Sequence, residues 1–437
     1  MNRRQFLQST AAATTSLLLS SPSFAQPTSE PLNIALIGVG EQGRNLMQSA
    51  IAIRNIKIRA VCDIWPYRRK PAIDFLDIYK HKAAEYSELA EMLQKEKDLH
   101  AAIIATPDFL HAPQSIACLK AGLHVYCEKP TADSPDAARA MIQTARQANR
   151  LLQIGYQRRS NPRYLHVHQK LLTEANLPGR LTHINAQWTT PLREDLGFPK
   201  RALIPDDELR RHGYASMHEF RNWRHFRKYT PGLFADLGIH QIDVSNWFLN
   251  ATPRSIFASA SLDYYKGREH PDNLFAILEY DTPIGLVRAS YQILTTTSAG
   301  AGPSEHFMGP QGSIRISEDH RGTKIYREPY APDWDRYVNL HYLNKEQPAN
   351  SLRDQPQDPN AIKVQETGQL TRYDLPITLD KPPHQYHLEN FFASIRGQSQ
   401  LTCPATTAFA TEAALWKANQ SIATKSMLAF APADFTA

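Results

Sequence analysis

The chain has 437 residues, of which 42% are hydrophobic and 21% charged, and its formal net charge is +6 at pH 7. This length exceeds that of one typical domain and predicts two. Because the basic residues are scattered rather than clustered, the composition argues against a nucleic-acid partner. The cysteines match neither a zinc site nor a disulfide framework, so buried free thiols are expected. They are Cys62, Cys118, Cys127 and Cys403.

Residues 1–25 have the features of an export signal. Arg3 and Arg4 precede a short run rich in Ala, Ser and Thr, and an A-x-A-like cleavage site ends at Ala25. The paired arginines resemble a twin-arginine signal, which exports folded proteins. An ordinary Sec signal and an uncleaved anchor are the alternatives, although the apolar run is short for a membrane span. The sequence therefore predicts a periplasmic protein that is free of the membrane after cleavage.

The first strong motif is a glycine-rich turn between an apolar run and a helix-like segment. Gly38, Gly40 and Gly43 form G-x-G-x-x-G, a spacing that lets the backbone turn sharply and approach a pyrophosphate. The N–H groups that open the following helix would face the phosphates. Glycines also mark ordinary turns. However, Asp63 ends the next extended run, where a carboxylate can accept hydrogen bonds from a ribose. Together these residues predict a dinucleotide site.

The same region bears on the choice between the two nicotinamide dinucleotides. The carboxylate of Asp63 would repel the 2'-phosphate of NADP, which favours NAD as the cofactor. Arg68 and Arg69 follow shortly after and could accept that phosphate, so NADP remains an alternative.

Residues 32–157 alternate strand-like and helix-like patterns, which predicts a doubly wound α/β fold with a parallel sheet. The strand-like runs are 33–37, 56–62, 100–105, 124–127 and 151–154. Gly122 is placed to end one helix, and Ser134 and Pro135 to begin another. Ligands of such sheets bind at the carboxyl ends of the strands. Those ends carry Thr106-Pro107, Glu128-Lys129-Pro130 and Tyr156-Gln157.

Residues 158–380 show a different pattern, in which longer extended runs are separated by turns. The pattern predicts a second domain of the α+β class with a large, mostly antiparallel sheet. The runs are 181–189, 255–261, 273–280, 285–293, 305–308 and 313–317. Residues 320–380 are rich in Pro, Asp, Asn and Tyr and are expected to be loops. Residues 384–437 are expected to form C-terminal helices that pack back on the rest.

Within the second domain, apolar spacing predicts a helix from about residue 233 to 249. Asp236, His240 and Asp243 are four and three residues apart, so they project from neighbouring points on one helix face. With Asp236 one turn away to orient it, His240 is predicted to act as a general base rather than as a core histidine. Asp243 is expected to bind a substrate hydroxyl.

Taken together, these motifs resemble the Gfo/Idh/MocA family, named for glucose-fructose oxidoreductase, inositol dehydrogenase and a rhizopine catabolism protein. The resemblance runs from about residue 32 to the C-terminus through GVGEQG, TPDFLHAPQSIACLKAGLHVYCEKP, GLFADLGIHQID and HLENFFASIRG. It implies a Rossmann domain that holds NAD or NADP, a C-terminal sheet domain, and a sugar-like substrate between them. It also implies a homo-oligomer formed through the exposed face of that sheet.

The resemblance also implies site residues. Lys129, Asp236 and His240 match the catalytic lysine and the Asp-x-x-x-His pair of the family. The implied cofactor contacts are Gly38, Gly40, Glu41, Gln42, Gly43, Asp63, Thr106, Pro107, His111, Glu128, Lys129 and Gln157. The implied substrate contacts are Lys129, Arg158, Trp188, Asp236, His240 and Asp243.

Residue chemistry supports some of these contacts and excludes a metal. A sugar could stack on Trp188 and pair its hydroxyls with Arg158 and Asn161, while packing at the domain junction is the alternative for all three. His384 and His387 are three residues apart, but no third ligand is indicated. No metal is therefore predicted.

Two reaction classes are compatible with these residues. In an NAD(P)-dependent oxidoreductase, which is favoured slightly, His240 removes a hydroxyl proton from a sugar while Lys129 assists hydride transfer to tightly bound nicotinamide. In an NAD-dependent glycoside hydrolase or lyase, the same step gives a transient keto-sugar, a group is eliminated, and the hydride returns. Export favours the second class, because the periplasm offers no ready pool of free nicotinamide. Residues 229–232, YTPG, stand where many relatives carry consecutive glycines, which leaves the reaction type open. A non-catalytic sensor is disfavoured, because Lys129 and His240 occur together.

Overall fold

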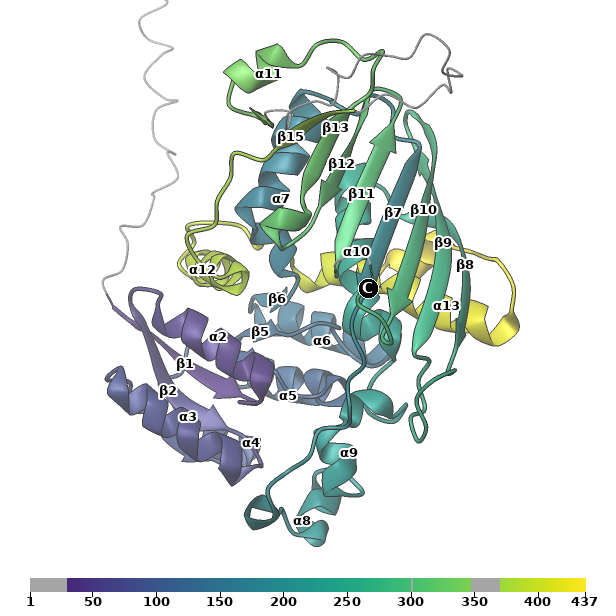
Figure 1. Ribbon diagram of the computed structural model, residues 1–437. Coiled ribbons are helices and arrows are strands. Elements are labelled where there is room, and N and C mark those ends of the chain that lie inside the picture. The colour runs from purple at the N-terminus through teal and green to yellow at the C-terminus, as the bar shows by residue number, and fades with distance from the viewer. Residues whose placement is uncertain (1–29, 300–301, 347–369) are drawn as a thin grey trace, which may run out of the picture.

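A computed structural model describes residues 30–299, 302–346 and 370–437. Figure 1 shows two sheets, a six-stranded parallel sheet in the N-terminal part and a ten-stranded, mostly antiparallel sheet in the C-terminal part. The predicted fold class, a Rossmann domain followed by an α+β sheet domain, is therefore confirmed. The predicted export signal, residues 1–25, lies outside the described residues.

The N-terminal sheet has the strand order β3-β2-β1-β4-β5-β6, and its pairs are parallel. Its strands are β1 (Leu32–Ile37), β2 (Ile56–Cys62), β3 (Ala84–Tyr86), β4 (Ala101–Ile104), β5 (His124–Cys127) and β6 (Leu152–Ile154). The intervening helices are α2 (Glu41–Ile51), α3 (Pro66–Ile78), α4 (Leu89–Lys95), α5 (Asp108–Lys120) and α6 (Pro135–Ala148). The sequence pattern missed β3, because its three residues include Glu85 and form no apolar run. The strand order reverses between β1 and β4, and ligands bind at such a switch point.

The strands of this sheet are buried on both faces, so successive residues enter two different cores. Ile34 of β1 packs in a core with Phe391 of α12 (Pro383–Ile395), whereas Ala35 lies in the larger core that continues into the C-terminal domain. Two-sided burial explains why β1 and β4 read as continuous apolar runs. The four cysteines are free and buried, as the sequence predicted.

Helix ends in this domain follow the predicted chemistry. Ser134 caps α6 by accepting a hydrogen bond from Ala137 N at 3.4 Å, and Pro135 occupies the first helical position. Gly122, just beyond α5, has φ of 85°, the left-handed conformation that commonly ends a helix.

The C-terminal sheet has the strand order β14-β15-β13-β12-β11-β7-β10-β9-β8-β16. Its strands are β7 (His183–Thr189), β8 (Pro253–Ser261), β9 (Asn273–Thr282), β10 (Gly285–Leu294), β11 (Ser304–Gly309), β12 (Gly312–Ile316), β13 (Lys324–Arg327), β14 (Asn344–Lys345), β15 (Thr371–Asp374) and β16 (Leu428–Ala429). The sequence predicted that residues 320–380 would be loops, and this prediction was wrong in part. The strands β13, β14 and β15 and the helix α11 (Asp335–Asn339) lie there. These elements have two to five residues each, too few for a period to emerge.

Helices cover one face of this sheet, and no helix of the described residues covers the other, which is called the open face. α10 (Ile239–Leu249) contacts β7 and β11, and α13 (Ala405–Thr424) contacts β8. The predicted C-terminal helices are thus present as α12 and α13. The chain enters α10 through a π-helical segment, η5 (Phe234–Gly238). The other short helices of this part are η1 (Gln157–Ser160), α7 (Pro162–His166), the π-helical η2 (Val167–Glu174), η6 (His320–Gly322) and η8 (Pro432–Phe435).

Residues 190–232, between β7 and η5, form a cap that the sequence pattern did not predict. The cap contains η3 (Lys200–Ala202), α8 (Asp206–Arg211), α9 (Met217–Arg221) and η4 (Trp223–His225). Figure 1 shows α8 and α9 projecting from the sheet domain beside the N-terminal domain. Trp65 of the Rossmann domain donates a hydrogen bond to Ala202 O at 2.6 Å and shares a small core with Leu209 and Tyr214. The cap is therefore anchored on both domains.

Candidate active site

A cavity of about 980 Å³ lies between the carboxyl ends of the parallel strands, the cap and the sheet domain. Of the predicted cofactor contacts, all but Gly43 line it. Of the predicted substrate contacts, Lys129, Trp188, Asp236 and His240 line it, whereas Arg158 and Asp243 do not. The structure therefore brings most of the predicted site together in one space.

The glycine turn leaves room for a phosphate group. A Cβ on Gly38, whose φ is 83°, would lie 2.7 Å from Ala105 O, and a Cβ on Gly43 would lie 1.9 Å from Gly38 O. Those two glycines allow close packing of the backbone, which is why Gly43 is absent from the cavity wall. Gly40 differs, because no atom lies within 4 Å of its Cβ position. Gly40 begins α2 without a side-chain cap, so the first N–H groups of the helix are available to an anion. This arrangement fits a dinucleotide.

Asp63 is held at the end of β2 by two backbone groups. Its Oδ2 accepts a hydrogen bond from Val39 N and its Oδ1 from Trp65 N, both at 2.8 Å. Each carboxylate oxygen keeps lone-pair capacity for a ribose hydroxyl. Arg69 is engaged by Asp63 O at 2.5 Å and Glu85 Oε2 at 3.2 Å. Arg68 instead lines the cavity.

His111 ties two strand ends together. Its Nδ1 lies 2.7 Å from Pro130 O and its Nε2 lies 2.8 Å from Thr106 O. Both acceptors are carbonyls, so both ring nitrogens must donate, which only the imidazolium can do. Burial alone would lower the pKa of His111, but Cys127, Asp108 and the Pro130 carbonyl raise it to about 10. His111 thereby fixes the segment that carries Lys129.

Lys129 reaches from the Rossmann domain to the helix of the sheet domain. Its Nζ donates hydrogen bonds to the backbone oxygens of Asp236 and, at 3.4 Å, Ala235. The same Nζ lies 3.9 Å from Asp236 Oδ1. With two of its three N–H groups on carbonyls, the ammonium is positioned and retains one donor.

Asp236 does not orient His240 as the sequence predicted. Its Oδ1 accepts a hydrogen bond from Arg224 Nε of the cap at 2.9 Å. No hydrogen bond joins Asp236 to His240 among the described residues. A guanidinium forms a stronger, charge-assisted hydrogen bond with a carboxylate than a neutral imidazole does. Burial would raise the pKa of Asp236, but Arg224 and Lys129 lower it below its ordinary value.

His240 is held by aromatic rings instead. Its ring stacks on Trp188 with 5.9 Å between centroids and an interplanar angle of 27°, and meets Tyr156 edge-on, also at 5.9 Å. Its Nδ1 has no hydrogen-bond partner among the residues that the structure describes. Burial, with the charges of Lys129 and Arg158, lowers the pKa of His240 well below its ordinary value. His240 is therefore a neutral imidazole at pH 7.

Arg158 and Asp243 lie behind the cavity in buried ion pairs. Arg158 Nη1 pairs with Glu305 Oε1, and its Nε lies 3.3 Å from Glu318 Oε1. Asp243 accepts hydrogen bonds from Arg159 at 2.9 Å and from Thr411 at 3.0 Å. For Arg158, this position agrees with the alternative given above, that the residue packs at the domain junction. Direct substrate contacts by Arg158 and Asp243 remain untested predictions.

Two other residues singled out in the sequence have structural partners. Asn161 caps α7, because its Oδ1 accepts a hydrogen bond from Arg163 N at 2.9 Å. His387 is enclosed, with Nε2 2.9 Å from Ile154 O and Nδ1 2.7 Å from Ser160 Oγ. His384 lines the cavity. Within the described ranges, no group of three or more His, Cys, Asp or Glu side chains could hold a metal ion.

Sequence reasoning missed Arg224 and Glu318, which also line the cavity. Arg224 lies in the unpredicted cap and Glu318 on a turn after β12, so no local spacing connected either residue to the site.

Among the helices that the structure describes, none is long and apolar enough to cross a membrane.

Comparisons with known proteins address the family. The model of an oxidoreductase family with an NAD-binding Rossmann fold matches residues 32–156, and that of the C-terminal alpha/beta domain of such a family matches residues 208–429. Inositol 2-dehydrogenase from Salmonella typhimurium is 25% identical over 227 residues, 52% of this chain and 56% of that protein. D-glucoside 3-dehydrogenase from Escherichia coli is 27% identical over 223 residues, 51% and 55% of the two chains. The matched region thus spans just over half the length of these relatives.

A solved structure extends the likeness to the whole fold. The WlbA dehydrogenase from Bordetella pertussis, in complex with NADH and UDP-GlcNAcA, superposes with a TM-score of 0.63 at 17% identity, covering 92% of this chain and 99% of that one. Because the two family models match one domain each and together cover most of the chain, the protein belongs to the Gfo/Idh/MocA oxidoreductase family.

Proposed function

We propose that the protein is an NAD-dependent oxidoreductase that acts on a hydroxyl group of a sugar or sugar derivative. The observation that carries this proposal is the single cavity joining the glycine turn to Lys129 and His240. The names of two similar proteins, inositol 2-dehydrogenase and D-glucoside 3-dehydrogenase, support a ring with several hydroxyl groups. When bound, a nicotinamide would supply the hydride acceptor.

The side chains of the cavity can manage the proton and the charge of such a reaction. His240 is neutral at pH 7, so one of its ring nitrogens can accept the hydroxyl proton. Lys129 has a donor left over after its two carbonyl contacts, and its positive charge would stabilise an alkoxide. Trp188 lines the cavity beside His240, where its indole could contact the C–H surface of a sugar.

The preference for NAD over NADP rests on Asp63, whose carboxylate would repel a 2'-phosphate. Arg69 is engaged elsewhere, which leaves Arg68 as the nearer cation for NADP. Acid quenching of protein from native periplasm, followed by chromatography, should release NAD. Release of NADP would contradict this assignment. An apo preparation unable to take up NAD on soaking would contradict the oxidoreductase itself.

The second candidate is an NAD-dependent glycoside hydrolase or lyase that works through a transient keto-sugar. The cap favours it, because Trp65 is 2% exposed beneath the cap and a cofactor enclosed there would be retained between turnovers. Retention suits a reaction in which the hydride returns to the substrate within each cycle.

An experiment in D₂O separates the two candidates. A cleaving enzyme makes the carbon beside the transient ketone acidic, so released sugar should carry solvent deuterium there without net oxidation. An oxidoreductase should give a keto product or lactone with stoichiometric reduced nicotinamide, or require a second substrate to remove the hydride. A panel of methyl and nitrophenyl glycosides serves as the probe. Deuterated free sugar would overturn the first candidate in favour of the second.

Export to the periplasm is proposed from residues 1–25. Replacing both Arg3 and Arg4 with Lys should keep the protein in the cytoplasm, as measured by cell fractionation, if the signal is of the twin-arginine type. Unchanged export of this variant would favour the Sec route instead.

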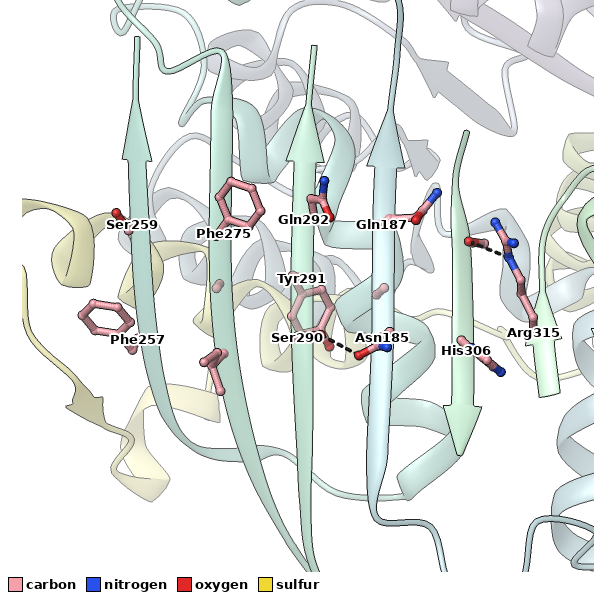
Figure 2. Close-up of a pocket in the computed structure, with 14 residues that line it drawn as sticks. Asn185, Gln187, Phe257, Ser259, Phe275, Ser290, Tyr291, Gln292, His306 and Arg315 are labelled. Carbon is pink, nitrogen blue, oxygen red and sulfur yellow. Dashed lines mark hydrogen bonds between the residues drawn. The ribbon is translucent and has the colours of Figure 1, made fainter. Parts of the chain in front are cut away.

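We also propose a homo-oligomer formed through the open face of the ten-stranded sheet. Figure 2 shows this face, where the rings of Phe257 and Phe275 stand on adjacent strands beside a row of polar side chains. Phe275 is 50% exposed and Ile277 is 47% exposed, and exposed apolar side chains grouped on one face are typical of subunit contacts. Phe275→Arg should lower the mass measured by sedimentation, and Ile78→Arg, an exposed position on α3 of the Rossmann domain, should not. Equal masses for both variants would contradict this interface.

A further inference from the structure

Glu318, a residue of the sheet domain, presents its carboxylate to the cavity. It lies just after β12 and lines the same cavity as Trp188 and His240. Its Oε1 accepts hydrogen bonds from Gln157 Nε2 at 3.1 Å and Arg158 Nε at 3.3 Å. Its Oε2 accepts none within the described part of the chain. One oxygen therefore fixes the side chain while the other keeps its capacity to accept.

The backbone around Glu318 is also fixed. Arg163, which is 2% exposed, donates from Nη1 to Glu318 O at 3.2 Å and from Nη2 to Thr323 Oγ1 at 2.6 Å. Thr323 Oγ1 in turn accepts a hydrogen bond from Ser317 N at 3.2 Å. The turn is thus pinned on both sides of Glu318, and a carboxylate held in this way is preorganised for a ligand.

The charge of Glu318 is only partly balanced. Arg158 is shared with Glu305, a fully buried carboxyl that pairs with Arg158 Nη1 and accepts a hydrogen bond from Tyr164 at 3.1 Å. One cation therefore serves two carboxyl groups. Of the two, Glu318 is the partly exposed one, with 26% of its side chain accessible. It therefore offers the cavity a hydrogen-bond acceptor and a negative charge.

We propose that Glu318 is a specificity residue that accepts hydrogen bonds from sugar hydroxyl groups and disfavours a sugar that carries a carboxylate. The inference rests on the proposed function, because it presumes a sugar in this cavity. Neutral, hydroxyl-rich rings supply donors to Oε2. A uronate would bring a like charge toward a carboxylate, and such juxtaposition discriminates against the wrong ligand.

The test compares two probes, methyl β-D-glucopyranoside and methyl β-D-glucuronide, on the full chain loaded with NAD. Saturation-transfer NMR titrations measure the affinity of each probe. The wild type should bind the glucoside about 10-fold more tightly than the glucuronide, and Glu318→Gln should narrow the ratio to about threefold or less. Asp319→Asn, which changes the adjacent carboxylate outside the cavity, should keep the wild-type ratio.

A second variant guards against a purely structural effect. Glu318→Asp keeps the charge on a shorter side chain, so it should weaken glucoside binding while still excluding the glucuronide. The proposed role of Glu318 would be overturned if the ratio of glucoside to glucuronide affinity stayed unchanged in Glu318→Gln, or if it collapsed in Asp319→Asn. Neither result would contradict the proposed sugar substrate. Failure of both probes to bind the NAD-loaded wild type would contradict the sugar substrate and this inference with it.

Discussion

Removing the charge of Lys129 tests the reaction centre most directly. Lys129→Met replaces the ammonium with a side chain of similar length, and the lysine is only 13% exposed, so the packing of its stem should survive. The variant loses the donors to Asp236 O and Ala235 O and the cation 3.9 Å from Asp236 Oδ1. Arg224 still pairs with Asp236, so the carboxylate keeps a partner.

The expected size of the effect follows from this geometry. Two unit charges 3.9 Å apart interact by about 4 kcal/mol at an effective dielectric constant of about 20. A substrate alkoxide at a similar distance would lose part of this energy, because water and neighbouring dipoles replace some of it. A loss of about 3–4 kcal/mol of transition-state stabilisation corresponds to a fall in turnover of about 10²–10³-fold.

The assay measures turnover on the glycoside panel together with the NAD released by acid quenching. Turnover should fall in Lys129→Met while NAD content stays at the wild-type level, because the glycine turn and Asp63 are untouched. Lys120→Met, an exposed lysine at the end of α5, is the matched control and should change neither quantity. Turnover within about threefold of the wild type, with NAD retained, would refute the assigned role. Loss of NAD would instead assign Lys129 to cofactor binding.

Four further predictions concern the same site and its surroundings. His240→Ala should lower turnover by about 10²–10⁴-fold without changing NAD content, and retained turnover would remove His240 from the mechanism. Gly43→Ala should lower the thermal unfolding midpoint, because its Cβ would meet Gly38 O at 1.9 Å. Gly40→Ala should unfold normally yet lose NAD, and normal NAD binding would place the pyrophosphate elsewhere. Burial lowers the pKa of His387 to about 4, below its ordinary 6.5, so the unfolded chain binds the proton more tightly. His387 should therefore contribute up to about 3 kcal/mol to the fall in the free energy of unfolding from pH 6.5 to 4, measured by urea titration as the smaller fall in His387→Gln than in the wild type.

The Rossmann domain could be predicted because its signals are local in sequence. A Cβ at Gly38 or Gly43 would lie 2.7 Å or less from a backbone oxygen, so this spacing encodes a turn that admits no side chain at either position. Strand β3 and the strands β13 to β15 escaped prediction because each is short and carries a charged residue, whereas the equally short β4, β5 and β6 carry no Asp, Glu, Lys or Arg. The cap escaped for another reason. Its hydrophobic residues pack against Trp65, more than a hundred residues away, and against one another across short helices and loops that share no single period.

The same difference between local and distant signals applies to the site residues. Lys129 and His240, each of which stands in a contiguous motif, both line the cavity. The partner of Asp236 could not be predicted from the helix alone, since Arg224 arrives from the cap. Arg158 and Asp243 carry residue types suited to a sugar, yet their distant partners bury them behind the cavity wall. Residue chemistry thus predicts what a side chain can bind, whereas tertiary packing decides what it meets.

The reaction centre consequently depends on how the two domains are joined. Lys129 belongs to the Rossmann domain, but its Nζ donates hydrogen bonds to backbone oxygens of η5 in the sheet domain. Two residues later, Thr131 donates through its N–H to Glu412 of α13 at 2.7 Å, so the C-terminal helix holds the same segment from behind. His111 fixes that segment from a third side through Pro130 O. Because three elements distant in sequence position one ammonium group, mutations at the junction should alter turnover even where they touch neither cofactor nor substrate.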